Sequence, residues 1–393
     1  MGQAVTRRGL LGAGLAGACS AAAHPMPSTM TLAAAPFDAR LVVIILRGGM
    51  DGLGVVAPYA DPLWADYRPS LADASAMGDL DGFFGLHAGL AELRPLWNRG
   101  ELGFVHAVST PYRDKRSHFD GQDLLEAGTG QAAPEAGVRD GWLNRLLGAM
   151  PGTVAETAFA VGMDEMRVLR GDAPVLQWSP QADVALTPQA QVLLEQVYAR
   201  DPLFAAAAAE AMDLAEAIDR EKLTPLANGL PREPLAAFAA ERLNEGTRVA
   251  SYSLTGWDTH KRQAGSLNRA LARLQRSILS LHEGLGGNWE RTAVIAMTEF
   301  GRTARENGSR GTDHGTGGLM VLAGGALRGG RIYGDWPGLE EAALYDRRDL
   351  MPTADVRAYA ASAIQGLFGI GRSTLEGAVF PGLDMGGTPG LAL

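Results

Sequence analysis

Cysteine is almost absent from this chain: Cys19 is the only one among 393 residues. It lies in an N-terminal segment with the features of an export signal, so a chain cleaved after it would contain no thiol. Disulfide bonds, thiolate zinc sites and a cysteine nucleophile would then be excluded from the mature protein. Alternatively Cys19 could carry a lipid, although Ala16 stands where such sites usually have leucine.

Dense clusters of lysine and arginine and long internal apolar runs are also missing. The formal net charge is −9, which argues against nonspecific nucleic-acid binding, because that activity needs a basic face. No apolar run after the signal is long enough to cross a bilayer, so we expect no transmembrane segment in the mature chain. Hydrophobic residues make up 46% of the sequence, enough for a large buried core.

Twin arginines mark the N-terminal segment. Arg7 and Arg8 precede a weakly apolar run of glycine, alanine and leucine that extends to Ala23. This pattern resembles a Tat export signal, with Ala-x-Ala cleavage sites at 21–23 and 33–35. We therefore expect residues 1–35 to be signal and linker, and 36–393 to be a domain exported to the periplasm or secreted. The alternative is a flexible basic tail before a helix.

Strand and helix patterns alternate along the rest of the chain. The apolar, β-branched run 41–46 is typical of a central strand buried on both faces. Further strands are predicted at 103–108, 159–163, 247–254, 292–297 and 318–323, and helices at 86–97, 141–147, 267–281 and 355–368. The alanine-rich stretch 187–245 predicts an additional helical layer. The alternation indicates an α/β fold, a three-layer α/β/α sandwich with a mostly parallel central sheet.

Carboxylates and imidazoles recur beside the predicted strand ends, which suggests a metal or catalytic site built from loops at one sheet edge. Asp258 and His260 can present an oxygen and a nitrogen to one cation, and His314 could add a second nitrogen. Such a set suits zinc, manganese or iron better than calcium. The candidate ligands for one or two divalent ions are Asp51, Asp258, His260, Glu299, Asp313 and His314. Alternatively, these carboxylates form Asx turns or helix caps and the histidines bond the backbone.

Three further residues are candidates for catalysis: Ser117, His118 and Arg302. Ser117 stands beside His118 and could be a nucleophile activated by a metal. It could equally be a helix N-cap, because Asp120 follows three residues later. Arg302 could hold an anionic oxyester by a bidentate contact, or it could pair with Glu299.

The order of the motifs resembles the DUF1501 family of exported bacterial proteins. The motifs lie at 47–53, 116–120, 256–260, 298–303, 311–315 and 329–336. The resemblance extends over nearly all of the chain after the signal. That family is similar to the alkaline phosphatase and sulfatase superfamily, which implies a parallel sheet between helices and a two-metal centre at the strand ends.

The resemblance also implies roles for individual residues. Asp51 matches the first metal aspartate, and Ser117 falls where a hydroxyl nucleophile is expected. Asp258 and His260 match the Asp/His pair of one metal site, and His314 matches the last metal histidine. The superfamily has Asp-His where this chain has Glu299 followed by Phe300, so the second metal site would be weakened.

The implied function is an exported, metal-dependent hydrolase of phosphate or sulfate esters, with a small anionic ester as its substrate. The rival hypothesis is a noncatalytic periplasmic binding protein on a degenerate form of the same fold. A metal-dependent mutase or transferase would carry the same sequence features.

Overall fold

The β-branched run near the start of the folded chain forms the central strand of a large sheet. In the computed structural model, strand β1 (Arg40–Arg47) lies parallel to both β8 (Val249–Thr255) and β9 (Thr292–Met297). The six residues 41–46 of β1 have no exposed surface. A strand covered on both faces needs apolar side chains at successive positions, which explains the unbroken run in the sequence.

The central sheet has nine strands in the part of the chain that the structure describes, namely residues 37–130, 137–162, 166–178, 224–387 and 390–393. Their order is β11-β5-β10-β9-β1-β8-β6-β7, and β12 pairs with β5. The strands not yet located are β5 (Leu102–Ser109), β6 (Ala158–Val161), β7 (Leu176–Trp178), β10 (Gly318–Ala323), β11 (Ile332–Tyr333) and β12 (Ala354–Asp355). Strand β10 is antiparallel to β5 and β9, and the other pairs are parallel. The predicted mostly parallel α/β sheet is confirmed.

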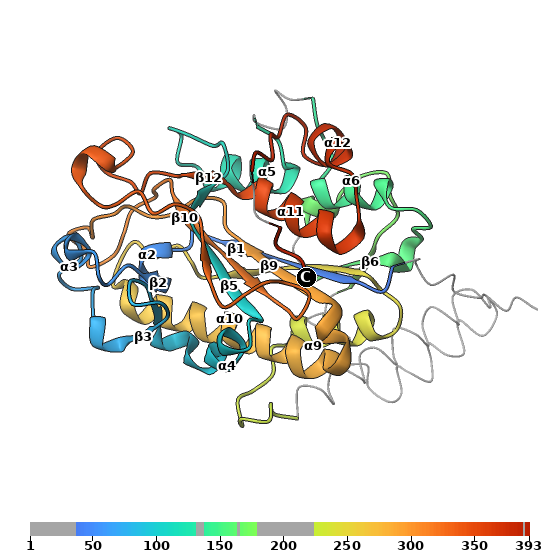
Figure 1. Cartoon of the computed structure of the whole chain (residues 1–393), viewed down its shortest axis with the longest axis horizontal. Coiled ribbons are helices and arrows are strands. Elements are labelled where there is room, and N and C mark those ends of the chain that lie inside the picture. The colour runs from blue at the N-terminus through green and yellow to red at the C-terminus, as the bar shows by residue number, and fades with distance from the viewer. Residues whose placement is uncertain (1–36, 131–136, 163–165, 179–223, 388–389) are drawn as a thin grey trace, which may run out of the picture. The chain divides into compact units, whose positions relative to one another are not determined.

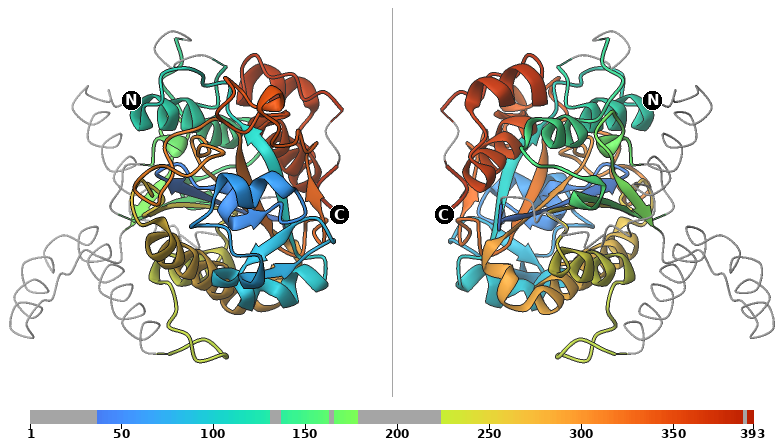
Figure 2. Two further views of the ribbon diagram at one scale, coloured as in Figure 1. Left: turned by 90° about the vertical axis from the view of Figure 1, so that its left-hand side faces the viewer. Right: turned by 90° about the vertical axis from the view of Figure 1, so that its right-hand side faces the viewer.

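Helices cover both faces of this sheet (Figure 1, Figure 2). One face packs against α4 (Arg94–Asn98), α9 (Pro234–Asn244), α10 (Gln263–Leu285) and η2 (Ala88–Leu93). The other packs against α5 (His118–Ala127), α6 (Trp142–Ala149), α11 (Val356–Phe368) and η7 (Leu375–Val379), with α12 (Arg372–Thr374) preceding η7. Alternate β1 side chains enter the two cores: Ile44 belongs to the first and Val43 to the second.

Smaller elements lie around the central sheet. Strands β2 (Val56–Ala57), β4 (Gly85–His87) and β3 (Met77–Asp79) form a second, antiparallel sheet. The short helices are α2 (Gly52–Val55), α3 (Pro62–Tyr67), η1 (Ala74–Ala76), η3 (Ala155–Thr157), η4 (Arg167–Leu169), η5 (Gly286–Arg291) and η6 (Glu341–Ala343). None of the described helices is both long and apolar enough to cross a membrane.

The single helix predicted at 86–97 is wrong. Leu86 lies in β4, where its backbone pairs with Val56 and Gly78. The chain then forms the 3₁₀ turns of η2, and a new α-helix begins at Arg94, with Pro95 in its first turn. Proline has no N–H to give to a preceding turn, so it suits the start of a helix rather than its interior.

Two predicted segments lie wholly or mostly outside the described residues. The export signal with Cys19 falls in residues 1–36, and much of the predicted helical layer falls in 179–223. The described end of that layer forms α9, which packs against α10. The described residues belong to the unit Ala35–Leu393.

A buried histidine in β5 makes the stability of the fold depend on pH. Burial lowers the pKa of His106 to about 4, although its Nε2 lies 2.9 Å from the Val56 carbonyl. Between pH 6.5 and about 4, His106 is protonated in the unfolded chain but stays neutral in the folded chain. The free energy of unfolding therefore falls as the pH falls. Lowering the pH from 7.5 to 4.5 should therefore remove roughly 2–3 kcal/mol through this residue. Urea unfolding at the two pH values should show this decrease in the free energy of unfolding for the native chain but not for His106→Gln. Equal decreases in both proteins would contradict the role of His106.

Candidate metal centre

Five strand ends meet at one edge of the sheet because of the strand directions. Strands β1, β8 and β9 are mutually parallel, so the loops after them leave from the same edge. Strand β5 points the same way, since both β5 and β9 are antiparallel to β10. The reversed β10 instead begins at this edge, so the loop before it arrives there. The topology thus brings together segments from widely separated parts of the sequence.

Glycines allow these loops to touch. Gly48 has a φ of +123°, and a Cβ on it would lie 2.5 Å from the backbone nitrogen of Asp258. A side chain at that position would therefore push the β1 loop away from the β8 loop. Gly311 likewise packs directly on the backbone of His260, which joins the loop before β10 to the loop after β8.

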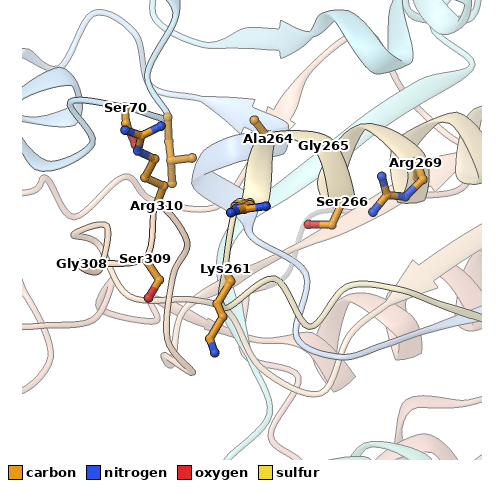
Figure 3. A pocket seen from close by; sticks show the side chains of 11 residues that line it. Ser70, Lys261, Ala264, Gly265, Ser266, Arg269, Gly308, Ser309 and Arg310 are labelled. Carbon is orange, nitrogen blue, oxygen red and sulfur yellow. The ribbon is translucent and has the colours of Figure 1, made fainter.

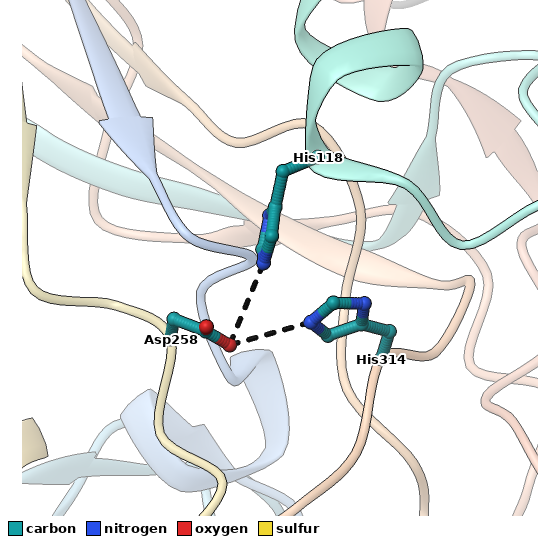
Figure 4. A group of neighbouring side chains, drawn as sticks. All are labelled: His118, Asp258 and His314. Atoms are coloured by element: carbon teal, nitrogen blue, oxygen red, sulfur yellow. Dashed lines mark hydrogen bonds and ion pairs between the residues drawn. The ribbon is translucent and has the colours of Figure 1, made fainter.

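The centre of the site is one carboxylate oxygen surrounded by three imidazole nitrogens. Asp258 Oδ1 lies 3.0 Å from His260 Nε2, 3.3 Å from His314 Nε2 and 3.5 Å from His118 Nε2. The Nε2 atoms of His260 and His314 are 2.9 Å apart. Figure 4 shows His118, from the start of α5, and His314 both directed at Asp258. The ligating atoms of these three residues all lie within 4.8 Å of one another.

Each of the three histidines is held through its other ring nitrogen. The Nδ1 of His118 lies 2.8 Å from Glu299 Oε1, and that of His260 lies 3.1 Å from Asp313 Oδ1. The Nδ1 of His314 lies 2.8 Å from the Arg116 carbonyl. Carboxylates and carbonyls accept hydrogen bonds, so in the neutral rings the proton lies on Nδ1 and the Nε2 lone pair is free. Metal-ligating histidines are commonly oriented in this way.

These atoms fit a metal ion. Two facing Nε2 lone pairs at 2.9 Å repel each other unless a proton or a metal cation lies between them. The Nε2 of His118 is buried and has no hydrogen-bond partner. Neighbouring nitrogen ligands of a tetrahedral zinc ion are about 3.3 Å apart, given Zn–N bonds of about 2.0–2.1 Å. The separations of 2.9–3.5 Å around Asp258 Oδ1 are close to that value.

The local charges favour an ionised carboxylate and a neutral imidazole. Partial burial alone would raise the pKa of Asp258, but the hydrogen bond and charge of Arg302 outweigh it and hold that pKa below its ordinary value. Burial lowers the pKa of His314. The hydrogen bond that His118 donates to Glu299 raises the pKa of His118 against the effect of burial. Metal binding would have to displace a proton from that ring, so it should weaken at acidic pH.

Arg302 is buried beneath the site. Its guanidinium donates to Asp258 Oδ1 at 2.6 Å and to the carbonyls of Gly48, Gly49, Trp257 and Thr312. Only 1% of the residue is exposed. Its donors are therefore directed at protein acceptors, and the side chain joins the loops after β1 and β8 to the loop before β10. Its ionic partner is Asp258 rather than Glu299.

Glu299 and Asp313 stand behind the histidines. The buried carboxylate of Glu299 accepts from the Gly48 N–H and the Gln122 amide as well as facing His118. Burial would raise its pKa, but these hydrogen bonds hold it below the usual range. Asp313 faces His260 and also accepts from Asn307. Both residues thus orient candidate ligands.

Asp51 lies in a different environment from the three histidines. Its two carboxylate oxygens accept from the Arg68 guanidinium at 2.6 and 2.9 Å, and Gln263 donates to Oδ2. Both members of the Asp51–Arg68 pair are about 1% exposed. The arginine cation takes the place that a metal ion could have at this carboxylate.

Ser117 begins α5, immediately before His118. Its Oγ accepts from the Asp120 N–H at 3.4 Å, the N-cap bond that the sequence spacing suggested. That bond is long, and the side chain is only partly buried. Capping therefore leaves acceptor capacity on the hydroxyl beside the site.

Sequence reasoning missed two features of the site. The sequence predicts that His118 acts beside a nucleophile, but in the structure its Nε2 lies close to Asp258 and His314 as a candidate metal ligand. The loop between β5 and α5 separates His118 from the nearest strand end, so the sequence pattern does not indicate this position. Arg68 was not singled out, because it follows the short helix α3 in a segment without a motif. Only the placement of the 59–81 segment against the loop after β1 brings Arg68 to Asp51.

Solved structures of other proteins are similar to this chain only at low scores. Lipoteichoic acid synthase LtaP from Listeria monocytogenes is 9% identical, with a TM-score of 0.40 over 88% of this chain and 76% of that one. Phosphoethanolamine transferase EptA from Neisseria meningitidis is 10% identical, with a TM-score of 0.39 over 93% of this chain and 62% of EptA. An alkaline phosphatase superfamily protein from Vibrio parahaemolyticus is 12% identical, with a TM-score of 0.34 over 75% of this chain and 62% of the Vibrio protein. No curated protein sequence matches the chain.

One family model matches the sequence over residues 104–373, and its description is "Protein of unknown function (DUF1501)". The match contains His118, Asp258, His260 and His314, whereas the motif around Asp51 lies before it. It covers more than half of the chain. The chain therefore belongs to the DUF1501 family.

Proposed function

We propose that this protein binds one divalent transition metal ion, zinc or manganese, and hydrolyses phosphate or sulfate esters with it. The ligands are Asp258, His118, His260 and His314. The observation that supports this most strongly is the convergence of three Nε2 atoms on Asp258 Oδ1, each ring being held by an acceptor at Nδ1. Imidazole and carboxylate ligands together suit zinc or manganese.

One ion is proposed rather than two because the other candidate ligands are engaged. The carboxylate of Asp51 is paired with Arg68, and that of Glu299 faces His118, Gln122 and Gly48. Neither keeps an oxygen directed at a second ion. The site is open to solvent on one side, since about half of the Asp258 side chain is exposed. With four protein ligands in place, a substrate oxygen would have to add as a fifth ligand from this exposed side.

The proposed chemistry divides the work between the ion and the chain. A bound cation would polarise the ester and offset the charge that develops on its oxygens. Arg302 holds the Asp258 carboxylate, and Glu299 and Asp313 keep the protons of His118 and His260 on Nδ1. The Ser117 hydroxyl attacks phosphorus or sulfur: the serine–ester bond forms, the bond to the alcohol breaks, and the serine proton leaves with the alcohol. Water then hydrolyses the seryl ester and restores the serine.

The nucleophile can be tested without disturbing the metal. In Ser117→Ala we expect kcat for ester hydrolysis to fall by about 10³-fold or more, because the seryl ester cannot form. Metal content should stay the same. Ser373→Ala, in the exposed helix α12, is the matched control and should keep full activity. Unchanged turnover in Ser117→Ala would remove the serine mechanism. A metal-loaded native chain with no ester turnover would instead support the noncatalytic binding alternative.

Export is proposed from the N-terminal sequence. Residues 1–35 would be removed as a Tat signal, and 36–393 would act in the periplasm or outside the cell. Mass spectrometry of the chain from the periplasmic fraction should give a mature N-terminus after residue 23 or 35. An acylated N-terminus at Cys19 would show the lipid-anchored alternative.

A further inference from the structure

We propose that a basic pocket beside the metal centre binds a second sulfate or phosphate group of the substrate, so that the substrate is a polyanionic chain. This inference rests on the proposed ester hydrolysis. The pocket is a cavity of about 840 Å³, and four of its lining residues are cationic: Lys261, Arg262, Arg269 and Arg310. Cavities of this size accommodate drug-sized ligands or a few units of a polymer.

No acidic side chain among the described residues pairs with these four cations. Within the described ranges, none of them makes a salt bridge or a side-chain hydrogen bond. Glu306 contacts one lining residue, accepting from the backbone N–H and the hydroxyl of Ser70. Four like charges around one cavity repel each other, and they do so in a chain whose formal net charge is −9. An anionic ligand would remove this repulsion.

The pocket has two walls joined by backbone hydrogen bonds. Figure 3 shows Ser309 and Arg310 on one side, and on the other Lys261 in the loop before α10 and Ser266 and Arg269 on α10 itself. The Arg262 N–H donates to the Ser309 carbonyl at 3.0 Å, and the Gln263 N–H donates to the Arg310 carbonyl at 2.8 Å. The Ser309 hydroxyl could donate to an anionic oxygen as well, whereas those of Ser70 and Ser266 donate to Glu306 and to the Gln263 carbonyl.

Two of the pocket arginines occupy backbone conformations that glycine adopts more easily. The φ angles are +47° at Arg262 and +56° at Arg310, in the left-handed region. An L-residue is strained there, whereas glycine is not. An arginine at such a position is compatible with a role that depends on its guanidinium group.

The pocket is coupled to the metal centre through one asparagine. Lys261 directly follows the candidate ligand His260. Asn307 Nδ2 donates to the His260 carbonyl and to Asp313 Oδ1, both at 3.0 Å. Its Oδ1 accepts from the Ser309 N–H at 2.9 Å. The same residue thus holds a pocket wall and the carboxylate behind His260, which places the pocket next to a proposed ligand.

The test measures polyanion binding in the absence of turnover. Full-length His314→Ala protein, which lacks a proposed ligand, is titrated by calorimetry with dextran sulfate oligomers, inorganic polyphosphate and neutral dextran. We expect one of the two polyanions to bind and neutral dextran not to bind. The polyanion that binds more tightly shows whether the pocket prefers sulfate or phosphate groups. Affinity should fall steeply as salt is added, because the contacts are ionic.

Glycine substitutions remove the pocket charges without backbone strain. In the same background, Arg262→Gly with Arg310→Gly should weaken binding at least tenfold and should not lower the unfolding midpoint. Arg347→Gly is the matched control, since Arg347 is exposed and also has a positive φ, but lies outside the pocket. Lys261→Gln with Arg269→Gln, which leaves the backbone unaltered, should weaken binding similarly.

The outcomes separate this inference from the proposed function. Binding that is equal in both pocket pairs and in Arg347→Gly would overturn the pocket. Binding lost in both pairs but kept in Arg347→Gly would support it, even if no ester were hydrolysed, and the proposed hydrolysis would then fail alone. If hydrolysis holds, Arg262→Gly with Arg310→Gly should raise KM for a multiply charged ester at least tenfold, and Arg347→Gly should leave it unchanged.

Discussion

Replacing His314 with alanine should weaken metal binding by about a hundredfold or more, enough to leave the purified protein nearly metal-free. The reason is geometric: His314 Nε2 lies within 3.3 Å of both His260 Nε2 and Asp258 Oδ1. Its loss removes one of four proposed ligands. Asp258→Ala should have the same effect, and titration with zinc against a competing chelator measures both. Ester hydrolysis should fall in parallel with occupancy.

A matched control separates the loss of a ligand from the loss of a histidine. His282 lies on α10, where its ring packs against Trp289, and it takes no part in the cluster. His282→Ala should keep one equivalent of metal. A His314→Ala protein that is folded and still binds metal with native affinity would contradict the ligand assignment.

Asp51→Asn should destabilise the fold by about 3–5 kcal/mol while leaving metal stoichiometry unchanged. The substitution keeps the shape of the side chain but removes the charge that pairs with Arg68 at about 1% exposure. The arginine would then be a buried cation without its counter-ion, held only by the carbonyls of Thr303 and Ala304 among its described partners. Urea unfolding measures the loss, and metal analysis of the same sample measures the stoichiometry.

A double variant tests whether the cost comes from the unpaired cation. Asp51→Leu with Arg68→Met removes both charges, so it should be less destabilised than Asp51→Asn alone. The opposite result, in which Asp51→Asn keeps its stability but loses metal, would show that Asp51 is a metal ligand and that its pair with Arg68 does not stabilise the fold.

The strands could be predicted from the sequence because a strand buried on both faces requires an unbroken run of apolar residues. A strand such as β1 must be apolar at every position, so the run 41–46 is unambiguous. The helix predicted at 86–97 is wrong because the sequence pattern there does not reveal a strand pairing. The apolar spacing there suits a helix, but Leu86 is used in pairing with Val56, and tertiary contacts outweigh local preference.

The positions of the candidate ligands could be predicted where these residues immediately follow a strand. Asp258 and His260 come directly after β8, so the sequence alone places them at the sheet edge. His314 precedes β10, and its position depends on β10 running antiparallel to β9, which the sequence pattern does not reveal. The ion pair of Asp51 with Arg68 joins residues 17 apart, with α2, β2 and α3 between them, and no periodic pattern in the sequence indicates such a contact.

Anomalous scattering at the zinc absorption edge, from crystals of full-length protein purified without chelators and soaked in zinc, tests the metal centre most directly. We expect one peak per chain, about 2.0–2.2 Å from Asp258 Oδ1 and from the Nε2 atoms of His118, His260 and His314. No peak among these atoms, or a peak at Asp51 with Arg68 displaced, would contradict the proposed centre.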